Sequence, residues 1–258
     1  MGLAKEKHLL RCGVGKSQSL YLDEIALRKG HGNFETVIST KRRVLTLLPG
    51  KSSEGIQGFL KSLPGIQQIQ QVCMDMCAPF AHAVKTVLPW AEIVIDRFHL
   101  IKHLNDSLDS WRKRTHCQLD EEKRKRFARI HFLLSKEYGS LPKDERRQVR
   151  DYLRLNPSVK KPYWLGQKFR RLLKYPWKRR ENAWIALRDW CEEARRIFPR
   201  FVKTVERWWT PVLNACMLPL SNARQEGINN KIKLIKRQGF GYRNRQTFRL
   251  KVLAAFNP

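Results

Sequence analysis

The pattern of apolar and polar positions changes character along the chain, and its first part is strand-like. Three apolar runs cover residues 20–27, 34–40 and 44–48. They are separated by Gly30-His31-Gly32 and by the basic triplet 41–43, and Pro49-Gly50 follows the third run. Short apolar runs bounded by glycine, proline or clustered polar residues are typical of strands joined by turns. The pattern therefore predicts a meander of three strands.

The next fifty residues alternate between helical and strand-like patterns. Helices are predicted over residues 52–63 and 79–88, and strands over residues 69–74 and 92–95. A meander followed by helix, strand, helix and strand is the order of a ribonuclease-H-like α/β domain. We therefore expect an α/β fold with a mixed five-stranded sheet.

From residue 98 to about residue 210 the strand pattern disappears. The segment is rich in Lys, Arg, Glu, Leu and Trp, and prolines punctuate it, so we expect several helices. Six of the eight tryptophans lie between Trp164 and Trp209. Most of them are expected to fill gaps between helices, and stacking on nucleic-acid bases is the alternative for some.

A late helix, residues 221–237, carries a single acid among bases and amides. Ser221 is a suitable N-cap. At about 100° per residue one face of the helix holds Glu226 and three phosphate-binding side chains, and isoleucines occupy the opposite face. The four residues of the first face are Glu226, Asn230, Lys233 and Arg237, and the isoleucines are Ile228, Ile232 and Ile235. The pattern is compatible with an amphipathic surface helix or with a metal-and-phosphate site.

The charge of the chain points to a polyanionic partner. Its 258 residues carry a formal net charge of +29, which repels itself unless a polyanion neutralises it, so nucleic acid is the expected partner and a membrane surface the lesser alternative. Basic runs at 112–114, 123–126 and 178–180 favour contacts with a nucleic-acid backbone. No apolar run is long enough to span a bilayer, and the first eleven residues make a poor secretory signal.

Two other motifs are weak. Six cysteines without a disulfide spacing indicate reduced thiols and a cytoplasmic protein. Cys73 and Cys77 have no second pair with which to hold zinc, so they are expected in or near the core. The segment 13–17 imitates the end of a phosphate-binding loop, but Leu10 stands where that loop requires glycine. No nucleotide cofactor is therefore expected.

Three acids stand out by position. Asp23 lies within the first predicted strand, Asp75 follows the fourth, and Glu226 lies on the late helix. The first and fourth strands are neighbours in a ribonuclease-H-like sheet, so Asp23 and Asp75 are expected to converge. A divalent cation offsets the cost of burying such carboxylates. Two hard cations about 4 Å apart would activate water or a 3′-hydroxyl for attack on a phosphodiester.

Four segments give the chain a resemblance to a known family. They are residues 22–31 (LDEIALRKGH), 74–76 (MDM), 94–99 (VIDRFH) and 221–244, which includes EGINNKIK and GFGYRN. With them the chain, from about Leu20 to its end, resembles the insertion-sequence transposases of the ISL-three type, which have a DDE catalytic core. The resemblance is weakest in the helical middle.

The resemblance implies a site and a reaction. Asp23, Asp75 and Glu226 match the three catalytic, metal-binding acids. Asp96 and His99 match an element that supports the site, and no role is expected for His103. Glu24 is expected to point to the other face of the strand, away from the metals. The implied function is cleavage and transfer of DNA strands with two Mg²⁺ ions, which Mn²⁺ would replace.

The same resemblance implies partners and an organisation. DNA is the expected partner, contacted by Asn230, Lys233, Lys236, Arg237 and Arg243, and a homo-oligomer on bacterial nucleoid DNA is expected. The predicted organisation is a leader or linker over 1–18, core segments over 19–105 and 216–258, and an all-α insertion over 106–215.

Family members usually begin with a cysteine-rich zinc-binding segment and a helix-turn-helix, and here only about twenty residues precede the first strand. The chain is therefore expected to be a catalytic core without its end-recognition region. The alternative function is a truncated, catalytically silent DNA-binding protein that interferes with or assists a full-length transposase. A third hypothesis, a basic RNA-binding or ribosome-associated protein, explains the charge but leaves the three acids unexplained.

Overall fold

The computed structural model describes most of the chain as two compact units. It describes residues 14, 18–26, 34–41, 43–218, 220, 223–239, 242 and 244–256, with the backbone alone at 223–226. The first unit combines Met1–Asp96 with Leu220–Pro258, and the second is Arg97–Pro219. The domain boundaries expected from the sequence, at 105/106 and 215/216, stay predictions.

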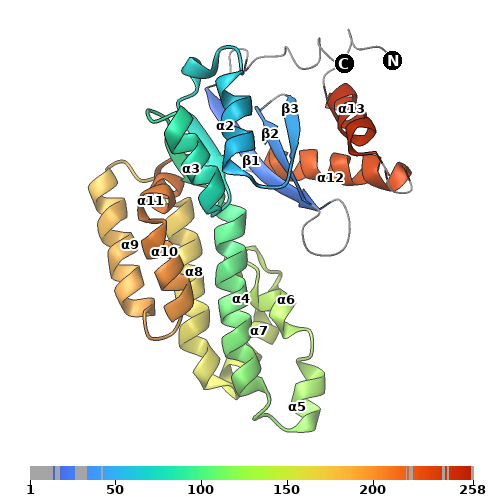
Figure 1. Cartoon of the computed structure of the whole chain (residues 1–258). Coiled ribbons are helices and arrows are strands. Elements are labelled where there is room, and N and C mark those ends of the chain that lie inside the picture. Colours follow the sequence, from blue (N-terminus) through green and yellow to red (C-terminus); the bar gives the residue numbers. More distant parts are fainter. Residues whose placement is uncertain are drawn as a thin grey trace. The chain divides into compact units, whose positions relative to one another are not determined.

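The first unit is built on a mixed five-stranded sheet in the order β3-β2-β1-β4-β5. Figure 1 labels three of its strands, β1, β2 and β3. The strands are β1 (Ser19–Ala26), β2 (Phe34–Ser39), β3 (Val44–Pro49), β4 (Gln71–Met74) and β5 (Glu92–Ile95). β2 is antiparallel to β1 and β3, whereas β1, β4 and β5 run parallel. The structure confirms the ribonuclease-H-like α/β fold. The expected turn at 30–32 lies outside the described residues.

Local signals in the sequence set the ends of the first two helices. The helix α2 (Ser53–Lys61) begins where the Ser52 hydroxyl accepts a hydrogen bond from the Gly55 amide over 3.0 Å. Gly50 adopts a positive φ of 69° and donates its amide to Phe34 O, which closes the connection after β3. The helix α3 (Ala78–Val87) has a proline in its first turn. These turns set the lengths of the connections between β3, β4 and β5.

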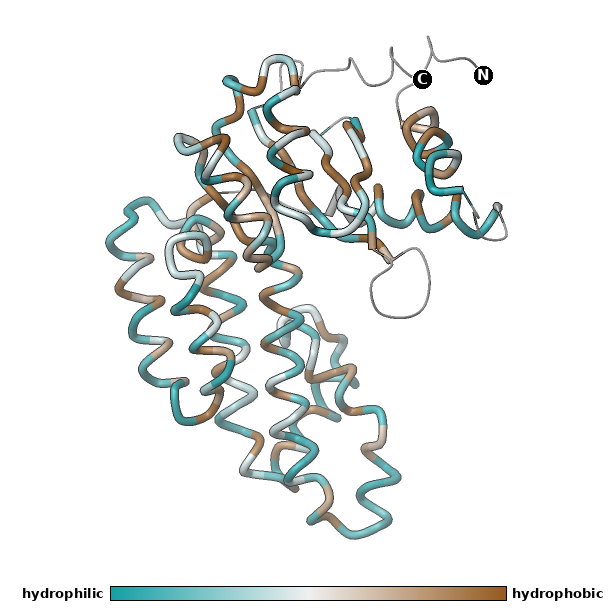
Figure 2. Tube along the Cα trace, in the orientation of Figure 1, coloured by the Kyte–Doolittle hydropathy of each residue, from teal (hydrophilic) through white to brown (hydrophobic). Residues whose placement is uncertain are grey.

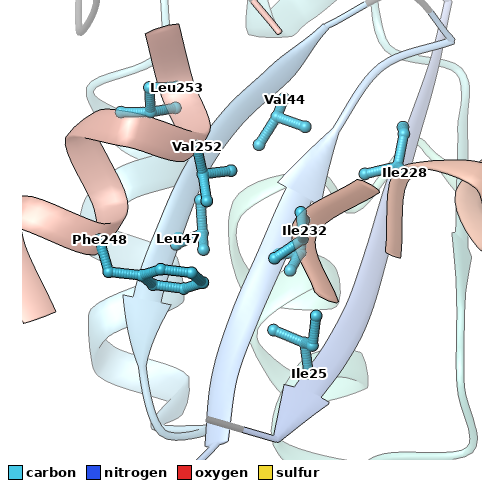
Figure 3. Packing of buried hydrophobic residues seen from close by; sticks show 9 residues of the cluster. Ile25, Val44, Leu47, Ile228, Ile232, Phe248, Val252 and Leu253 are labelled. Atoms are coloured by element: carbon cyan, nitrogen blue, oxygen red, sulfur yellow. The ribbon is translucent and has the colours of Figure 1, made fainter. Parts of the chain in front are cut away.

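Two C-terminal helices cover one face of the sheet. They are α12 (Ala223–Gln238) and α13 (Arg245–Phe256). Figure 3 shows their apolar side chains directed at β1 and β3. The packed residues are Ile25, Val37, Val44, Leu47, Ile228, Ile232, Phe248, Val252 and Leu253. Ile228 and Ile232 are buried and Ile235 packs against the same cluster, so the apolar face expected for the late helix is confirmed.

The second unit contains helices and no strand among its described residues. Its helices are α4 (Arg97–His116), α5 (Glu121–Arg126), α6 (Ile130–Leu134), α7 (Lys143–Leu155), α8 (Lys160–Lys174), α9 (Arg180–Ala194), α10 (Pro199–Arg207) and α11 (Trp209–Met217). Three aromatic rings form part of its core, with the Phe169 and Trp190 centroids 4.5 Å apart and Phe201 edge-on to both. The Trp190 indole donates to Leu165 O over 3.0 Å, which satisfies its polar atom.

The tryptophans of this unit are divided between its interior and its surface. Of the six between residues 164 and 209, only Trp190 is fully buried. Trp164 and Trp184 are exposed, and the other three are half-buried. Figure 2 shows that hydrophilic (teal) and hydrophobic (brown) residues alternate along these helices. The described helices include none long and apolar enough to cross a membrane.

Candidate active site

Strand register brings three aspartates to one level of the sheet. Leu22 of β1 pairs with Met74 of β4, and Met74 pairs with Ile95 of β5. The next residue along each strand is an aspartate: Asp23, Asp75 and Asp96. The Asp96 amide also donates to Met74 O over 2.9 Å. Neighbouring residues of parallel strands at one register level point to the same face, so the three positions share a face where β4 and β5 end.

Asp23 is held by hydrogen bonds on both carboxylate oxygens. It is buried, with 7% of its surface exposed. The Glu24 amide donates to Oδ1 over 2.7 Å, and the Asn229 side-chain amide donates to Oδ2 over 2.6 Å. Hydrogen bonds of this kind offset the cost of burying a carboxylate. The strand and α12 therefore fix Asp23 in one orientation.

Asp75 and Asp96 differ in exposure. Asp75 is partly exposed at the end of β4, and its Oδ1 accepts a hydrogen bond from the Met76 amide over 2.6 Å. Asp96 is 4% exposed and immediately precedes α4. Asp75 is thus the more open of the two carboxylates at this end of the sheet, while Asp96 is enclosed beside it.

The Glu24 carboxylate has a different partner from that of its neighbour Asp23 on β1. It forms an ion pair with Lys51, whereas Asp23 is bonded to α12. Burial lowers the pKa of Lys51, but the hydrogen bond that its ammonium donates to Glu24 and the nearby negative charges outweigh this effect and leave the pKa raised. The two adjacent carboxylates therefore have separate partners, as the alternation of side chains along a strand requires.

The helix α12 carries the remaining expected residues of the site. Glu226 lies in its first turns, one turn before Asn230, and its side chain is outside the described atoms. Its approach to Asp23 and Asp75 stays a prediction. Asn230, Lys233 and Arg237 are exposed on the helix.

The last expected contacts are spread over both units. The Lys236 ammonium donates to Ala26 O over 3.1 Å, which ties the helix to the end of β1. Arg243 lies outside the described residues. His99, in the second unit, is half-buried in the first turn of α4 with its ring centroid 5.6 Å from that of Phe98.

Asn229 is the residue that the sequence analysis missed. The helical-wheel argument placed Asn230 beside Glu226 and did not consider the preceding asparagine. In the structure α12 packs through Ile228 and Ile232, and this orientation sets Asn229 at the border of the buried face. The doubled asparagine was the available signal, since the residue next to a buried isoleucine is the one that can reach the sheet.

The sequence profile of the ISL-three-type transposases, which have a DDE core, matches residues 20–252. This chain belongs to that family. The transposase of insertion sequence element IS1001 from Bordetella parapertussis is 32% identical over 269 residues. The match takes in 97% of this chain and 65% of that protein. This chain therefore spans slightly less than two thirds of the length of that transposase.

Transposases of the DDE type generally use divalent metal ions, and the donors on this sheet fit such an ion. Carboxylate oxygens are the ligands that Mg²⁺ and Mn²⁺ prefer, and Asp23 and Asp75 supply them from adjacent strands. Among the described side chains, no three His, Cys, Asp or Glu groups lie close enough to hold an ion together. The side chain of Glu226 lies outside this comparison.

Proposed function

We propose that the chain is the catalytic core of a DNA transposase that cleaves DNA strands and transfers them to a target. The observation that carries the proposal is the in-register position of Asp23 and Asp75, with α12 hydrogen-bonded to Asp23 through Asn229. This arrangement fixes two carboxylates and places the helix that bears Glu226 against the same strand. The family membership supports the same reaction.

In this proposal Asp23, Asp75 and Glu226 hold two divalent ions, Mg²⁺ or Mn²⁺. When bound, these ions supply an activated oxygen nucleophile and stabilise the leaving oxygen of a phosphodiester. Asn229 holds the Asp23 carboxylate in place, and Asp96 supports Asp75 from the neighbouring strand, with His99 as a further support. The exposed side chains of Asn230, Lys233 and Arg237 contact the DNA backbone, and Arg243 and Lys236 add positive charge beside them.

Two displacements at phosphorus make up the reaction. In the first, the oxygen of water bonds to phosphorus and the bond to the 3′-oxygen breaks, which leaves a 3′-hydroxyl and a 5′-phosphate. In the second, that 3′-hydroxyl loses its proton and bonds to a phosphorus of the target DNA, and the 3′-oxygen of the target strand leaves. The complex is proposed to be a homo-oligomer on DNA, acting with the nucleoid in the cytoplasm of a bacterial cell.

The test is divalent-dependent nicking and strand transfer on DNA that carries transposon ends. Asp23→Asn, Asp75→Asn and Glu226→Gln should each abolish the reaction, whereas Glu54→Gln, an exposed acid on α2, should leave it unchanged. Titration calorimetry of Mn²⁺ binding provides a second measurement, which does not require the protein to recognise transposon ends. The assignment fails if the three site variants bind Mn²⁺ and nick DNA as the wild type does.

A second candidate function is a DNA-binding protein without catalysis that interferes with or assists a full-length transposase. The net charge of +29 favours it. Such a protein binds DNA with a strong dependence on salt, and the substitutions at Asp23, Asp75 and Glu226 leave that binding unchanged. Mn²⁺ binding that depends on the three acids would support the transposase core over the non-catalytic DNA-binding protein.

A further inference from the structure

The connection between α8 and α9 combines exposed aromatic rings with a run of cations. It comprises residues 175–179 and passes into α9 at Arg180. Tyr175 is 58% exposed, Trp177 is half-buried, and Lys178, Arg179 and Arg180 are all exposed. The basic run and the tryptophan were both prominent in the sequence, and the active site uses neither.

The rings of Tyr175 and Trp177 pack against each other in a tilted pair. Their centroids lie 4.5 Å apart with the planes inclined by 54°. The Trp177 indole donates to Leu172 O over 2.9 Å, and its backbone amide donates to Tyr175 O over 2.9 Å. Trp177 is therefore anchored to the end of α8 and supports Tyr175 from one side. The exposed side of the Tyr175 ring offers an aromatic surface at little further cost in conformational entropy.

The cations beside this ring pair make no ion pair within the described part of the molecule. The side chains of Lys178, Arg179 and Arg180 also make no hydrogen bond there, and Glu181 follows them as a single acid. The run in α5 is different, because Lys123 pairs with Asp120 and Lys125 pairs with Glu121. The charge of the α8–α9 loop is thus not neutralised by carboxylates of its own unit. An anionic ligand is the partner that such a surface favours.

We propose that the α8–α9 loop binds a DNA strand and stacks one unpaired base on Tyr175. The phosphates bind the exposed cations, and one base stacks on the exposed ring. This combination binds single strands with little preference for sequence. A paired base inside a duplex has both faces covered by its neighbours, so the ring selects DNA that is locally unpaired. The proposal rests on the proposed function only in taking DNA as the polyanion, and it requires no cleavage.

The test compares two fluorescent oligonucleotides in EDTA, where no cleavage occurs. One is a fully paired duplex, and the other carries a single unpaired 2-aminopurine. The wild type should bind the second more tightly and quench its fluorescence. Tyr175→Ala should weaken binding of the unpaired DNA by roughly tenfold, in line with the loss of one stacked base, and abolish the quenching. Tyr175→Phe keeps the ring and should retain both.

A matched pair of triple variants tests the cations. K178A/R179A/R180A and K123A/R124A/K125A each remove three positive charges from the same unit. The first should weaken binding of both oligonucleotides and reduce the dependence of affinity on salt by the equivalent of two or three phosphate contacts. The α5 triple should retain the preference for the unpaired base, since its lysines are paired with acids.

Three outcomes would overturn the proposal. They are an unchanged preference in Tyr175→Ala, equal effects of the two triple variants, and tighter Tyr175-dependent binding of RNA of the same sequence, which would identify an RNA site instead. Asp23→Asn separates this proposal from the proposed function. That variant should bind the unpaired oligonucleotide normally, whether or not the wild type cleaves DNA.

Discussion

The side-chain amide of Asn229 donates a hydrogen bond to the Asp23 carboxylate over 2.6 Å and joins two residues 206 positions apart. It connects the first strand of the sheet with the helix that carries Glu226. Within the described atoms it is a direct polar link from that helix to a proposed catalytic carboxylate. The activity of the site should therefore depend on it.

Replacing Asn229 tests this link. Asn229→Ala should lower the turnover rate of nicking about 10- to 100-fold, the usual effect of losing a partner that orients a metal ligand. Its KM for DNA should stay close to the wild-type value, because Asn229 holds a carboxylate rather than a phosphate. Steady-state kinetics and Mn²⁺ titration measure both effects.

The control for Asn229 is Gln238→Ala, which changes an exposed amide in the last turn of α12. It should leave turnover and Mn²⁺ affinity unchanged. Equal Mn²⁺ affinity in Asn229→Ala and the wild type would contradict a positioning role.

The packing of α12 on the sheet gives a stability prediction. Ile232 is fully buried in the cluster with Ile25 and Val37, whereas Leu234 on the same helix is 47% exposed. Ile232→Ala should lower the free energy of unfolding by about 2–5 kcal/mol because it leaves a cavity. Leu234→Ala should change it by less than about 0.5 kcal/mol. Urea denaturation monitored by circular dichroism distinguishes the two variants. Equal losses of unfolding free energy would contradict the packing of α12 through Ile232.

Glu35 should give stability a measurable dependence on pH. It is buried on β2, 3.8 Å from the Arg245 guanidinium. Burial raises its pKa above the ordinary 4.5, although Arg245 and Arg249 oppose the change. Because the folded state binds this proton more tightly than the unfolded chain, the contribution is fully present below pH 4.5 and is lost as the pH rises through the folded pKa.

Glu35→Gln removes this titration and keeps the shape of the side chain. Its stability relative to the wild type should rise as the pH increases from about 4 to 7, as linkage requires. Glu92→Gln, an exposed acid on β5, is the control and should show a flat difference. A Glu35→Gln difference that falls over the same range would reverse the sign and contradict the burial argument.

The cysteines should differ in reactivity toward a thiol reagent. Burial raises the pKa of Cys191 and of Cys216 to about 12, so neither forms appreciable thiolate near neutral pH. Cys117 is exposed on the surface. In the native protein Cys117 should react readily, while Cys191 and Cys216 should react only after unfolding. Labelling followed by peptide mass spectrometry gives the order, and early labelling of Cys191 would show that α9 opens.

The sequence predicted the sheet well because its strands are short, strongly apolar and bounded by turn residues. Pro49-Gly50 marked a chain reversal that needs no tertiary information. The position of Asp75 at the end of β4 was also predictable, since the apolar run stops at Met74. These features depend on local chemistry, so a pattern of residues is enough to find them.

The remaining features depend on contacts between distant segments. Asn229 and Asn230 differ by only about 100° on the helix, and the packing of Ile232 against the sheet decides which of them meets Asp23. The hydrogen bond from the Lys236 ammonium to Ala26 O also joins segments far apart in the chain. The exposure of Trp184 could not be predicted either, because a tryptophan in an amphipathic segment fits a core position as well as a surface one.

The first unit is assembled from two segments that are far apart in the sequence, and this has a consequence during synthesis. β1 leaves the ribosome early, but α12 and α13 follow only after the whole helical unit has been translated. Until then Ile25, Val44 and Leu47 lack the helices that cover them, and Asp23 lacks Asn229. A nascent or prematurely terminated chain therefore has an unfinished sheet and no working site. The sheet and the proposed site are therefore complete only once α12 and α13 have been added to them.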